Sequence, residues 1–292
     1  MDDNKEYISN SNFVQDFGNF TDRDFHKLSH FIFHEFGIQL PDKKKFLLKS
    51  RLVKRLKILG ISKYSEYVNY VMEGGTKGSE EVIEMIDVVS TNKTDFFREN
   101  AHFDFLIDKV VPDFMGKGIK SPKVWSAGCS SGEEVYTICM VFEEECRLNR
   151  LRDYQVYGSD ISVSILKKAV KAIYPFSRAE QIPDRYRKRY LLKSKGDGKQ
   201  EVRILKTLRD KTHFIWLNLM DDQYILAKNF DIIFCRNTLI YFDRETQKQV
   251  VSKLLEHLKP GGYLFIGHSE SLLNHNIPNL QQIKPTIYLK IK

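Results

Sequence analysis

A glycine-containing loop in residues 124–134 (VWSAGCSSGEE) has the residue types of a ligand-binding turn between a strand and a helix. Gly128 and Gly132 would let a ligand approach the backbone closely, and the start of the following helix would offer unpaired N–H groups. Glu133 and Glu134 follow directly, and carboxylates at this place repel a pyrophosphate but suit a cationic ligand. The alternative is a tight turn whose carboxylates only stabilise the helix N-terminus.

Asp160 lies 28 residues beyond Gly132, at the end of the next predicted strand. A carboxylate at such a strand end can accept both hydroxyls of a ribose. The alternative is a helix N-cap shared with Ser162. Together with the glycine loop, Asp160 favours a nucleoside. S-adenosylmethionine combines a nucleoside with sulfonium and ammonium charges and carries no phosphate.

Residues 230–243 (FDIIFCRNTLIYFD) would bring further polar side chains to the same edge. A buried strand delivers Cys235, Arg236 and Asn237 to the carboxyl ends of the strands, where open α/β sheets bind ligands. Tyr241 follows one turn later. Each of these residues could also be purely structural.

Two other strand ends carry candidate residues. Asn218 could hydrogen-bond an adenine edge, with Leu219 packed on the adenine face. His268 could act as a general base, although a lone histidine more often supports its surroundings through hydrogen bonds.

Residues 90–99 (STNKTDFFRE) lie where the periodicity of the chain changes. Phe96 and Phe97 could anchor this segment in a cleft and hold Arg98 over it. The alternative is a linker helix with an ordinary hydrophobic anchor.

Short apolar runs that alternate with helical patterns must position these side chains. Strands are predicted at 123–127, 155–158, 213–217, 231–235 and 263–267, and helices at 133–147, 163–173 and 244–258. This alternation predicts an α/β fold with a parallel sheet covered on both faces.

Two hairpins are predicted in addition. A turn at Pro285 joins residues 280–283 to a last strand at 286–292, which indicates an antiparallel hairpin at the sheet edge. The turn at 195–198 joins residues 190–192 to 202–205 and indicates a β-hairpin inserted into the α/β domain.

The first ninety residues show helical periodicity alone. Thr21 is a plausible N-cap of a helix that Gly37 ends. Further helices are predicted along 48–59, from Ser62 to the glycine pair 74–75, and from Ser79 onward. The sequence therefore predicts a small all-α domain ahead of the α/β domain.

Composition and charge narrow the class of protein. The chain has 292 residues, 42% of them hydrophobic and 29% charged, which is ordinary globular composition. No run reaches the roughly 18 apolar residues of a membrane span, and the polar, acidic start is unlike a signal peptide. The four cysteines form no CxxC pair, so we expect a reduced, cytoplasmic chain without a metal site.

The net charge of +8 is unevenly distributed. Residues 41–60 carry +7 and residues 185–211 carry +8, so the rest of the chain is acidic. Two basic patches on an acidic protein indicate docking onto a negatively charged partner. Nucleic acid, an anionic membrane and an acidic protein helix all satisfy this description.

Taken together, these stretches resemble the bacterial chemotaxis receptor methyltransferases, the CheR family. The family motif SxNxTxFFR is matched by Ser90, Asn92, Thr94 and residues 96–98. Further motifs match in order: WSAxxSxGEE at 125–134, SDI at 159–161, FCRNxxIYF at 234–242, LKPxGxL at 258–264 and GHSE at 267–270. The match runs from about residue 20 to the C-terminus, and ordered motifs with matching separations are highly specific.

The resemblance implies a Rossmann-like class I methyltransferase sheet, parallel with an antiparallel edge hairpin, preceded by an all-α domain. The expected divisions are an N-terminal extension at 1–20, the helical domain at 21–90, an interdomain linker contributing to the site at 91–120, and the methyltransferase domain at 121–292 with its inserted β-subdomain at about 176–211.

The resemblance also implies S-adenosyl-L-methionine as cofactor and S-adenosyl-L-homocysteine as product. The implied contacts are Asn92, Thr94, Arg98, Glu134, Asp160, Asn218, Leu219, Cys235 and Arg236, to which the motif positions add Gly128 and Asn237. The implied reaction is methyl esterification of glutamates on the cytoplasmic helices of methyl-accepting chemotaxis receptors. We expect Arg98 to orient the glutamate and Tyr241 to flank the methyl group as catalytic residues. A carboxylate with a pKa of about 4.3 is already ionised at neutral pH, so the enzyme has to position it and needs no strong base.

In this family a basic N-terminal helix is thought to dock on the acidic receptor helices. The matching docking residues are Lys43, Lys44, Lys45, Lys49, Arg51, Lys54 and Arg55. In some members the inserted hairpin binds a receptor C-terminal peptide, although the 195–198 turn is short compared with theirs. We expect no nucleic acid partner and no direct membrane insertion.

Two rival hypotheses come from other classes. An RNA methyltransferase would also need basic patches, and stacking aromatics in the hairpin would favour it, but that region has chiefly Tyr186 and Tyr190. A non-catalytic module that senses the cofactor and docks on receptors is contradicted by no residue, but no residue suggests it.

Overall fold

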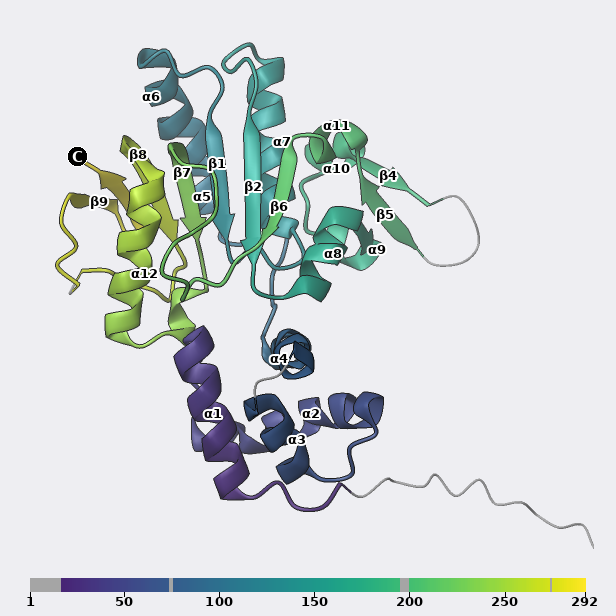
Figure 1. Ribbon diagram of the computed structural model, residues 1–292. Helices are drawn as coiled ribbons and strands as arrows, with labels where there is room; N and C mark the ends of the chain where they lie inside the picture. The colour runs from purple at the N-terminus through teal and green to yellow at the C-terminus, as the bar shows by residue number, and fades with distance from the viewer. Residues whose placement is uncertain (1–16, 74–75, 195–199, 274) are drawn as a thin grey trace, which may run out of the picture.

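The computed structural model describes residues 17–73, 76–194, 200–273 and 275–292. Figure 1 shows an all-helical N-terminal domain next to an α/β domain. The predicted extension at 1–20 falls almost wholly outside the described residues, as do the glycine pair 74–75 and the 195–198 turn. Among the described helices, none is long and apolar enough to cross a membrane.

The helical domain is built from amphipathic helices around one core. They are α1 (Asp22–Phe36), α2 (Lys45–Leu59), α3 (Tyr64–Met72) and α4 (Thr76–Val89), with a short 3-10 turn η1 (Asp42–Lys44) before α2. The Thr21 hydroxyl accepts from the backbone N–H of Asp24, whose carboxylate accepts in return from the N–H of Thr21, and Gly37 ends α1 in the left-handed conformation. Both predicted ends of this helix are confirmed.

The starts of the next helices differ from the prediction. α3 begins at Tyr64 rather than Ser62, and α4 begins at Thr76 rather than Ser79. Neither Lys63 nor Lys44, the residues before α3 and α2, makes a side-chain cap hydrogen bond, so packing of the apolar faces sets these boundaries.

The α/β domain contains a seven-stranded sheet. Its strands are β1 (Lys123–Ala127), β2 (Gln155–Asp160), β6 (Thr212–Trp216), β7 (Phe230–Cys235), β8 (Leu258–Ile266), β9 (Leu280–Lys284) and β10 (Ile287–Lys290), in the order β6-β2-β1-β7-β8-β10-β9. β6, β2, β1, β7 and β8 are parallel, and β10 runs antiparallel between β8 and β9. The predicted parallel sheet with an antiparallel edge hairpin is confirmed.

Both faces of the sheet are covered, because successive strand residues are buried on opposite sides. Ile232 and Phe234 of β7 join a core with α7 (Glu133–Arg147), whereas Ile233 and Cys235 join a second core with α12 (Arg244–His257). α8 (Val163–Lys171) follows β2. Figure 1 shows α7 and α12 lying on the two sides of the strands.

Residues 101–116 are more than the predicted linker. They form α5 (Ala101–Phe105), the π-helical turn η2 (Leu106–Val110) and α6 (Val111–Gly116). Phe103, Leu106, Val110 and Phe114 are buried in the same core as α7. This segment is therefore part of the helical layer of the α/β domain.

The inserted subdomain is a three-stranded antiparallel sheet rather than a hairpin. It comprises β3 (Ile173–Pro175), α9 (Phe176–Ala179), α10 (Asp184–Tyr190), β4 (Leu191–Lys193), β5 (Glu201–Ile204) and α11 (Lys206–Arg209). The strand order is β3-β5-β4. The predicted helix 163–173 stops earlier because Ala172 adopts a left-handed conformation, with φ of 53°, and the chain then enters β3. The subdomain therefore begins at residue 173 rather than about 176.

Candidate active site

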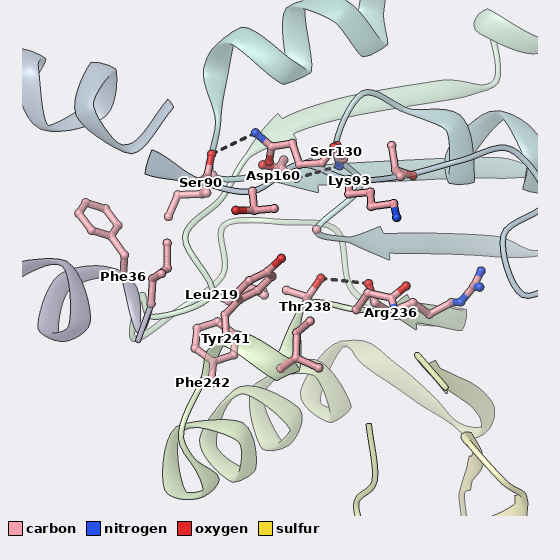
Figure 2. A pocket seen from close by; sticks show the side chains of 18 of the residues that line it. Phe36, Ser90, Lys93, Ser130, Asp160, Leu219, Arg236, Thr238, Tyr241 and Phe242 are labelled. Carbon is pink, nitrogen blue, oxygen red and sulfur yellow. Dashed lines mark hydrogen bonds between the residues drawn. The ribbon is translucent and has the colours of Figure 1, made fainter. Parts of the chain in front are cut away.

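A cavity of about 330 Å³ lies between the helical domain and the carboxyl edge of the sheet. This volume falls within the usual range for a small-molecule site. Eleven of the predicted binding or catalytic residues line it: Asn92, Thr94, Arg98, Gly128, Glu134, Asp160, Asn218, Leu219, Arg236, Asn237 and Tyr241. Figure 2 shows Asp160, Leu219, Arg236 and Tyr241 around this space.

The glycine loop closes one side of the cavity with backbone rather than side chains. Gly128 has φ of 78°, and a Cβ at this position would overlap the hydroxyl of Thr238. Gly132 has φ of 92°, and its Cβ would lie 2.9 Å from the Cβ of Ala169. Both positions therefore require glycine, and the loop stays thin where a ligand would approach it.

Asp160 at the end of β2 holds the glycine loop and faces the cavity. Its carboxylate accepts from the backbone N–H of Ser130 at 2.8 Å and of Ser162 at 3.0 Å. Burial raises the pKa of Asp160, and these backbone hydrogen bonds oppose that shift. The predicted alternative, a helix N-cap, belongs to Ser162, whose hydroxyl accepts from the N–H of Ile165.

The two glutamates after the loop have different surroundings. The Glu133 carboxylate is buried away from the cavity and pairs with Arg178 at 2.8 Å. The Glu134 carboxylate lines the cavity, accepts from the Ser126 hydroxyl at 2.7 Å and pairs with Arg236 at 3.0 Å. Burial raises the pKa of Glu134, and the Arg236 charge opposes it. Of these two glutamates, only Glu134 is therefore placed to meet a cationic ligand in the cavity.

Arg236 follows β7 as a buried cation. Its guanidinium donates to Glu134, to Glu99 at 3.0 Å and to the carbonyl of Arg98, and it lies over the Phe103 ring. Asn237 is left-handed, with φ of 57°, and donates through its amide to Glu99 at 3.2 Å. Arg236 thus connects the strand end, the α7 start and the 90–99 segment.

The 90–99 segment is anchored as the Phe pair indicated. Phe96 packs edge-on against Tyr174, and Phe97 against Phe103. The segment forms turns rather than a linker helix, with Phe97 and Glu99 both at positive φ. Arg98 donates to the carbonyl of Lys93 at 3.0 Å and lines the cavity.

The helical domain contributes the opposite wall. The Asn218 amide donates to the carbonyl of Glu35 at 2.8 Å, and the N–H of Gln39 donates to the carbonyl of Tyr241 at 3.1 Å. Burial raises the pKa of the Tyr241 hydroxyl, whereas the nearby Arg98 charge lowers it. The cavity therefore requires both domains.

Cys235 is placed differently from the expectation. Its side chain is fully buried in the core beneath α12 and is not among the lining residues. The alternation of the strand explains this, because Cys235 faces the same side as Ile233 while the cavity begins at the next residue. A contact from Cys235 could involve only its backbone.

His268 also stays outside the lining. Its backbone N–H donates to Glu99 at 3.2 Å, and its ring is half exposed. Nearby, His102 is buried, and burial together with the Arg236 charge lowers its pKa to about 3. The arrangement favours the supporting role of His268 over the general base.

The predicted docking residues of α2 do not share one surface. Arg55 is buried and pairs with Glu81 at 2.6 Å and Glu84 at 2.9 Å, so it cannot face a partner. Arg51 turns toward the cavity and donates to the carbonyls of Val89 and Ser90. The helical periodicity explains the burial of Arg55, because this residue lies on the same face of α2 as the buried leucines.

The remaining docking residues are partly or fully accessible. Lys43 and Lys54 are exposed, and Lys44 borders the cavity. Lys45 pairs with Asp22 at 2.6 Å, and Lys49 lies over the Tyr64 ring. The accessible basic surface of α2 is therefore smaller than the sequence predicted.

Several lining residues were not assigned from the sequence. Phe36, Ile38 and Leu40 reach the cavity from the end of α1 and the segment after it. The sequence signal that could have indicated them is that Ile38 and Leu40 are apolar although they follow Gly37, where the helix ends. Thr238 was part of a noted motif but received no role, and its hydroxyl fills the space left by Gly128.

Comparison with known proteins identifies the family. The model of the CheR methyltransferase SAM-binding domain matches residues 92–289, and that of the CheR methyltransferase all-alpha domain matches residues 23–90. The chain belongs to the CheR methyltransferase family. Its resemblance to this family, its fold and its activity as an S-adenosylmethionine-dependent methyltransferase are thereby confirmed.

Curated relatives extend this assignment along both domains of the CheR chain. A chemotaxis protein methyltransferase of Borreliella burgdorferi is 40% identical over 277 residues, which cover 93% of this chain and 95% of the relative. That of Escherichia coli is 35% identical, covering 86% and 85%. Chemotaxis protein methyltransferase 2 of Pseudomonas aeruginosa is 31% identical, covering 93% and 96%.

Proposed function

We propose that this CheR methyltransferase esterifies glutamate side chains of methyl-accepting chemotaxis receptors for sensory adaptation in bacterial chemotaxis. The donor is S-adenosyl-L-methionine, and S-adenosyl-L-homocysteine is the second product. The observation that carries the proposal is the likeness, along both domains, to relatives named chemotaxis protein methyltransferase. The receptor substrates are cytoplasmic domains, so we place the reaction in the cytoplasm.

The residues around the cavity fit the cofactor. The Glu134 carboxylate suits an ammonium group, and Asp160 suits ribose hydroxyls. Asn218 and Leu219 supply a polar edge and an apolar face for adenine, while Asn92 and Thr94 close the cavity from the 90–99 segment. Bound S-adenosylmethionine supplies an electrophilic methyl group on a sulfonium.

The work of the chain is to hold the incoming glutamate in place. We propose that the Arg98 guanidinium pairs with this carboxylate and that Tyr241 restricts its position from the facing wall. The glutamate, with a pKa of about 4.3, is already ionised at neutral pH, so its oxygen needs no base to remove a proton. Alignment of reacting groups can contribute about 7–11 kcal/mol.

The receptor would dock on α2. Lys44 of η1 and Leu47 and Arg51 of α2 line the cavity, so this segment borders it. Lys43 and Lys54 are exposed beside it, and Phe46 is 81% exposed. Exposed lysines with an exposed aromatic side chain suit an acidic amphipathic helix. A helix bound there would bring its glutamates next to the cavity.

The inserted sheet is a second proposed contact. β4 is an edge strand of the described sheet, and a receptor C-terminal peptide could extend that sheet by backbone pairing. Affinity for receptors with and without their C-terminal peptide distinguishes this contact from docking on α2. Only the intact receptor should gain affinity from pairing with β4.

The direct test is transfer of radiolabelled methyl groups to receptor-containing membranes. Base-labile label on the receptor is expected, since methyl esters hydrolyse in base. A receptor with its acidic acceptor helices changed from Glu to Ala is the matched control. Label that survives base, or label recovered in RNA, would contradict the proposal.

A further inference from the structure

A cluster of one carboxylate and two imidazoles lies beside the cavity. The Nδ1 atom of His102 is 3.6 Å from Oε2 of Glu99, and Nε2 of His268 is 3.9 Å from the same oxygen. One ligand atom from each residue lies within 4.8 Å of the other two. Glu99 lies just before α5 and His102 lies in it, whereas His268 follows β8. The tertiary structure therefore brings His268 to the other two residues.

The protonation of His102 follows from its neighbour Thr286. The Thr286 hydroxyl donates to the carbonyl of Pro285 at 2.6 Å, so its oxygen accepts from Nε2 of His102 at 2.8 Å. We therefore assign the His102 proton to Nε2, which leaves a lone pair on Nδ1. The His102 side chain is only 3% exposed, and among the described residues Nδ1 has no hydrogen-bond partner.

This lone pair faces a carboxylate, which is an unfavourable arrangement of two acceptors. A water or cation between them would relieve the repulsion. The charges are compatible with a cation, because the Glu99 carboxylate shares the guanidinium of Arg236 with Glu134 and is not compensated by that cation alone.

We propose that Glu99, His102 and His268 form a binding site for a zinc-type divalent cation. Two imidazole nitrogens and one carboxylate oxygen are a ligand set of Zn²⁺ with an open fourth position. A tetrahedral ion at 2.0–2.1 Å from each ligand separates ligand atoms by about 3.4 Å, somewhat less than the 3.6 and 3.9 Å that separate the two imidazole nitrogens from Glu99, and the two nitrogens themselves lie within 4.8 Å. The ring of His268 is 53% exposed and free to close this gap.

Hydrogen bonds from neighbouring residues orient two of the proposed ligands. Thr286 holds the outer nitrogen of His102, as a hydrogen-bond partner commonly does for metal-bound histidines. The Glu99 carboxylate is oriented by the Arg236 guanidinium at Oε2, by the Asn237 amide at Oε1 and by the backbone N–H of His268. The site contains no cysteine, which is why the cysteine spacing predicted no metal.

The site is tested by titrating Zn²⁺ into the full chain against a chromophoric chelator, without cofactor, so that the result is independent of the proposed methyl transfer. His30 and His34 are first changed to Ala in the background protein, because their Nε2 atoms lie 3.0 Å apart on exposed α1 and could bind Zn²⁺ themselves. We expect one ion per background chain. Visible absorption of bound Co²⁺ then reports nitrogen ligation.

His268→Ala is expected to weaken binding by at least about tenfold, and because its ring is half exposed the change leaves the core intact. His275→Ala, at a partly buried histidine outside the cluster, should leave affinity unchanged. Thr286→Val should weaken binding by about 10- to 100-fold, while Thr286→Ser, which keeps the hydroxyl, should not. A background chain that binds no Zn²⁺, or a His268→Ala chain with unchanged affinity, overturns the proposal.

Discussion

The Arg236 guanidinium joins three segments that are remote in the sequence. It contacts Glu134 at the start of α7, Glu99 after the FFR motif and the backbone of Arg98. A buried cation of this kind is stable only when carboxylates compensate it. Its role is therefore to hold Glu134 and Arg98 in fixed positions at the cavity.

The assignment of Arg98 and Tyr241 is open to a direct kinetic test. Arg98→Ala should lower kcat/KM by about 10- to 100-fold, since a hydrogen bond to a charged group contributes about 1.5–3 kcal/mol. Tyr241→Phe, which loses a neutral hydroxyl, should lower it by about 2- to 10-fold. Receptor methylation rates measure both, with calorimetry confirming that each variant still binds cofactor. Near-wild-type turnover in both variants would remove this assignment.

Glu134 should make cofactor affinity depend on pH. Burial raises its pKa, so it takes up a proton at a higher pH than an ordinary glutamate. The protonated form no longer attracts an ammonium, and affinity should therefore fall as the pH is lowered from neutrality. Calorimetric titration of the cofactor across this range measures the effect.

Glu134→Gln separates this contribution from that of Asp160, whose pKa burial also raises. The variant should bind the cofactor more weakly at neutral pH and show a smaller decrease in acid. An unchanged pH profile would show that Glu134 does not face the ammonium group.

At the scale of elements, α2 has one face in the core of the helical domain, one at the cavity and an outer face in solvent. Leu48, Leu52 and Leu56 pack in the domain core, and Arg51 reaches the cavity wall. Lys43, before the helix, and Lys54, on it, are exposed. One amphipathic helix can therefore serve stability, the site wall and docking together.

The outer face should steer receptor encounter. We expect Lys43→Glu with Lys54→Glu to raise the apparent receptor KM by about tenfold or more at low ionic strength and to reduce its salt dependence. Lys120→Glu with Lys123→Glu is the matched control, because it changes the net charge by the same amount and both lysines are exposed at the start of β1, at the end of the strands opposite to the cavity. If both sets of charge reversals changed the receptor KM equally, the net charge of the protein, and not the surface of α2, would explain the effect.

Arg55 should matter for stability instead. Arg55→Ala leaves Glu81 and its Tyr67 partner buried without a cation, which is expected to cost about 3–5 kcal/mol of unfolding free energy. Lys54→Ala, one residue away and exposed, should change it by no more than about 0.5 kcal/mol. Urea denaturation compares the two, and a stable Arg55→Ala protein would show that the buried pair is dispensable.

At the scale of the whole molecule, the cavity exists because the helical domain closes over the strand ends. Asp87 of α4 accepts from the N–H of Ser164 at the start of α8, and Glu35 accepts from Asn218. Figure 1 shows α1 and α4 reaching the α/β domain at separate places. The site wall and the domain interface are thus the same surface.

Gly37 provides a test of this interface. Alanine there would be strained at φ of 69° and would overlap the Phe242 ring, with the Met220 sulfur at 2.8 Å. Gly37→Ala should therefore lower the unfolding free energy by about 1 kcal/mol or more and weaken cofactor binding. Gly60→Ala has the same strain, with φ of 67°, but open space around it, and should leave cofactor affinity unchanged. If both variants bound the cofactor with similar affinity, the contact between the domains at Gly37 would not contribute to the cofactor site.

Much of this molecule was predictable because the signals are local. Thr21 and Gly37 delimit α1 through backbone caps, and the alternation of apolar runs gives the order of β1, α7 and β2. The ordered motifs also gave the family and most cavity residues, since parallel strand ends necessarily meet at one edge.

Other features were set only by packing between distant segments. Glu133 and Glu134 are equivalent in a motif, yet Arg178 takes one and Arg236 the other. Cys235 and Arg55 looked functional by position, but strand and helix faces turned both into the interior.

By itself, the sequence determined the elements, their order and the edge at which polar side chains gather, because caps and periodicity act over a few residues. Tertiary structure alone decided which carboxylate faces the cavity, which lysines face solvent and how His102 meets Glu99 and His268. These outcomes depend on contacts between residues far apart in the sequence, 45 positions for Glu133 with Arg178 and 102 for Glu134 with Arg236, whose burial and charge compensation no local pattern encodes.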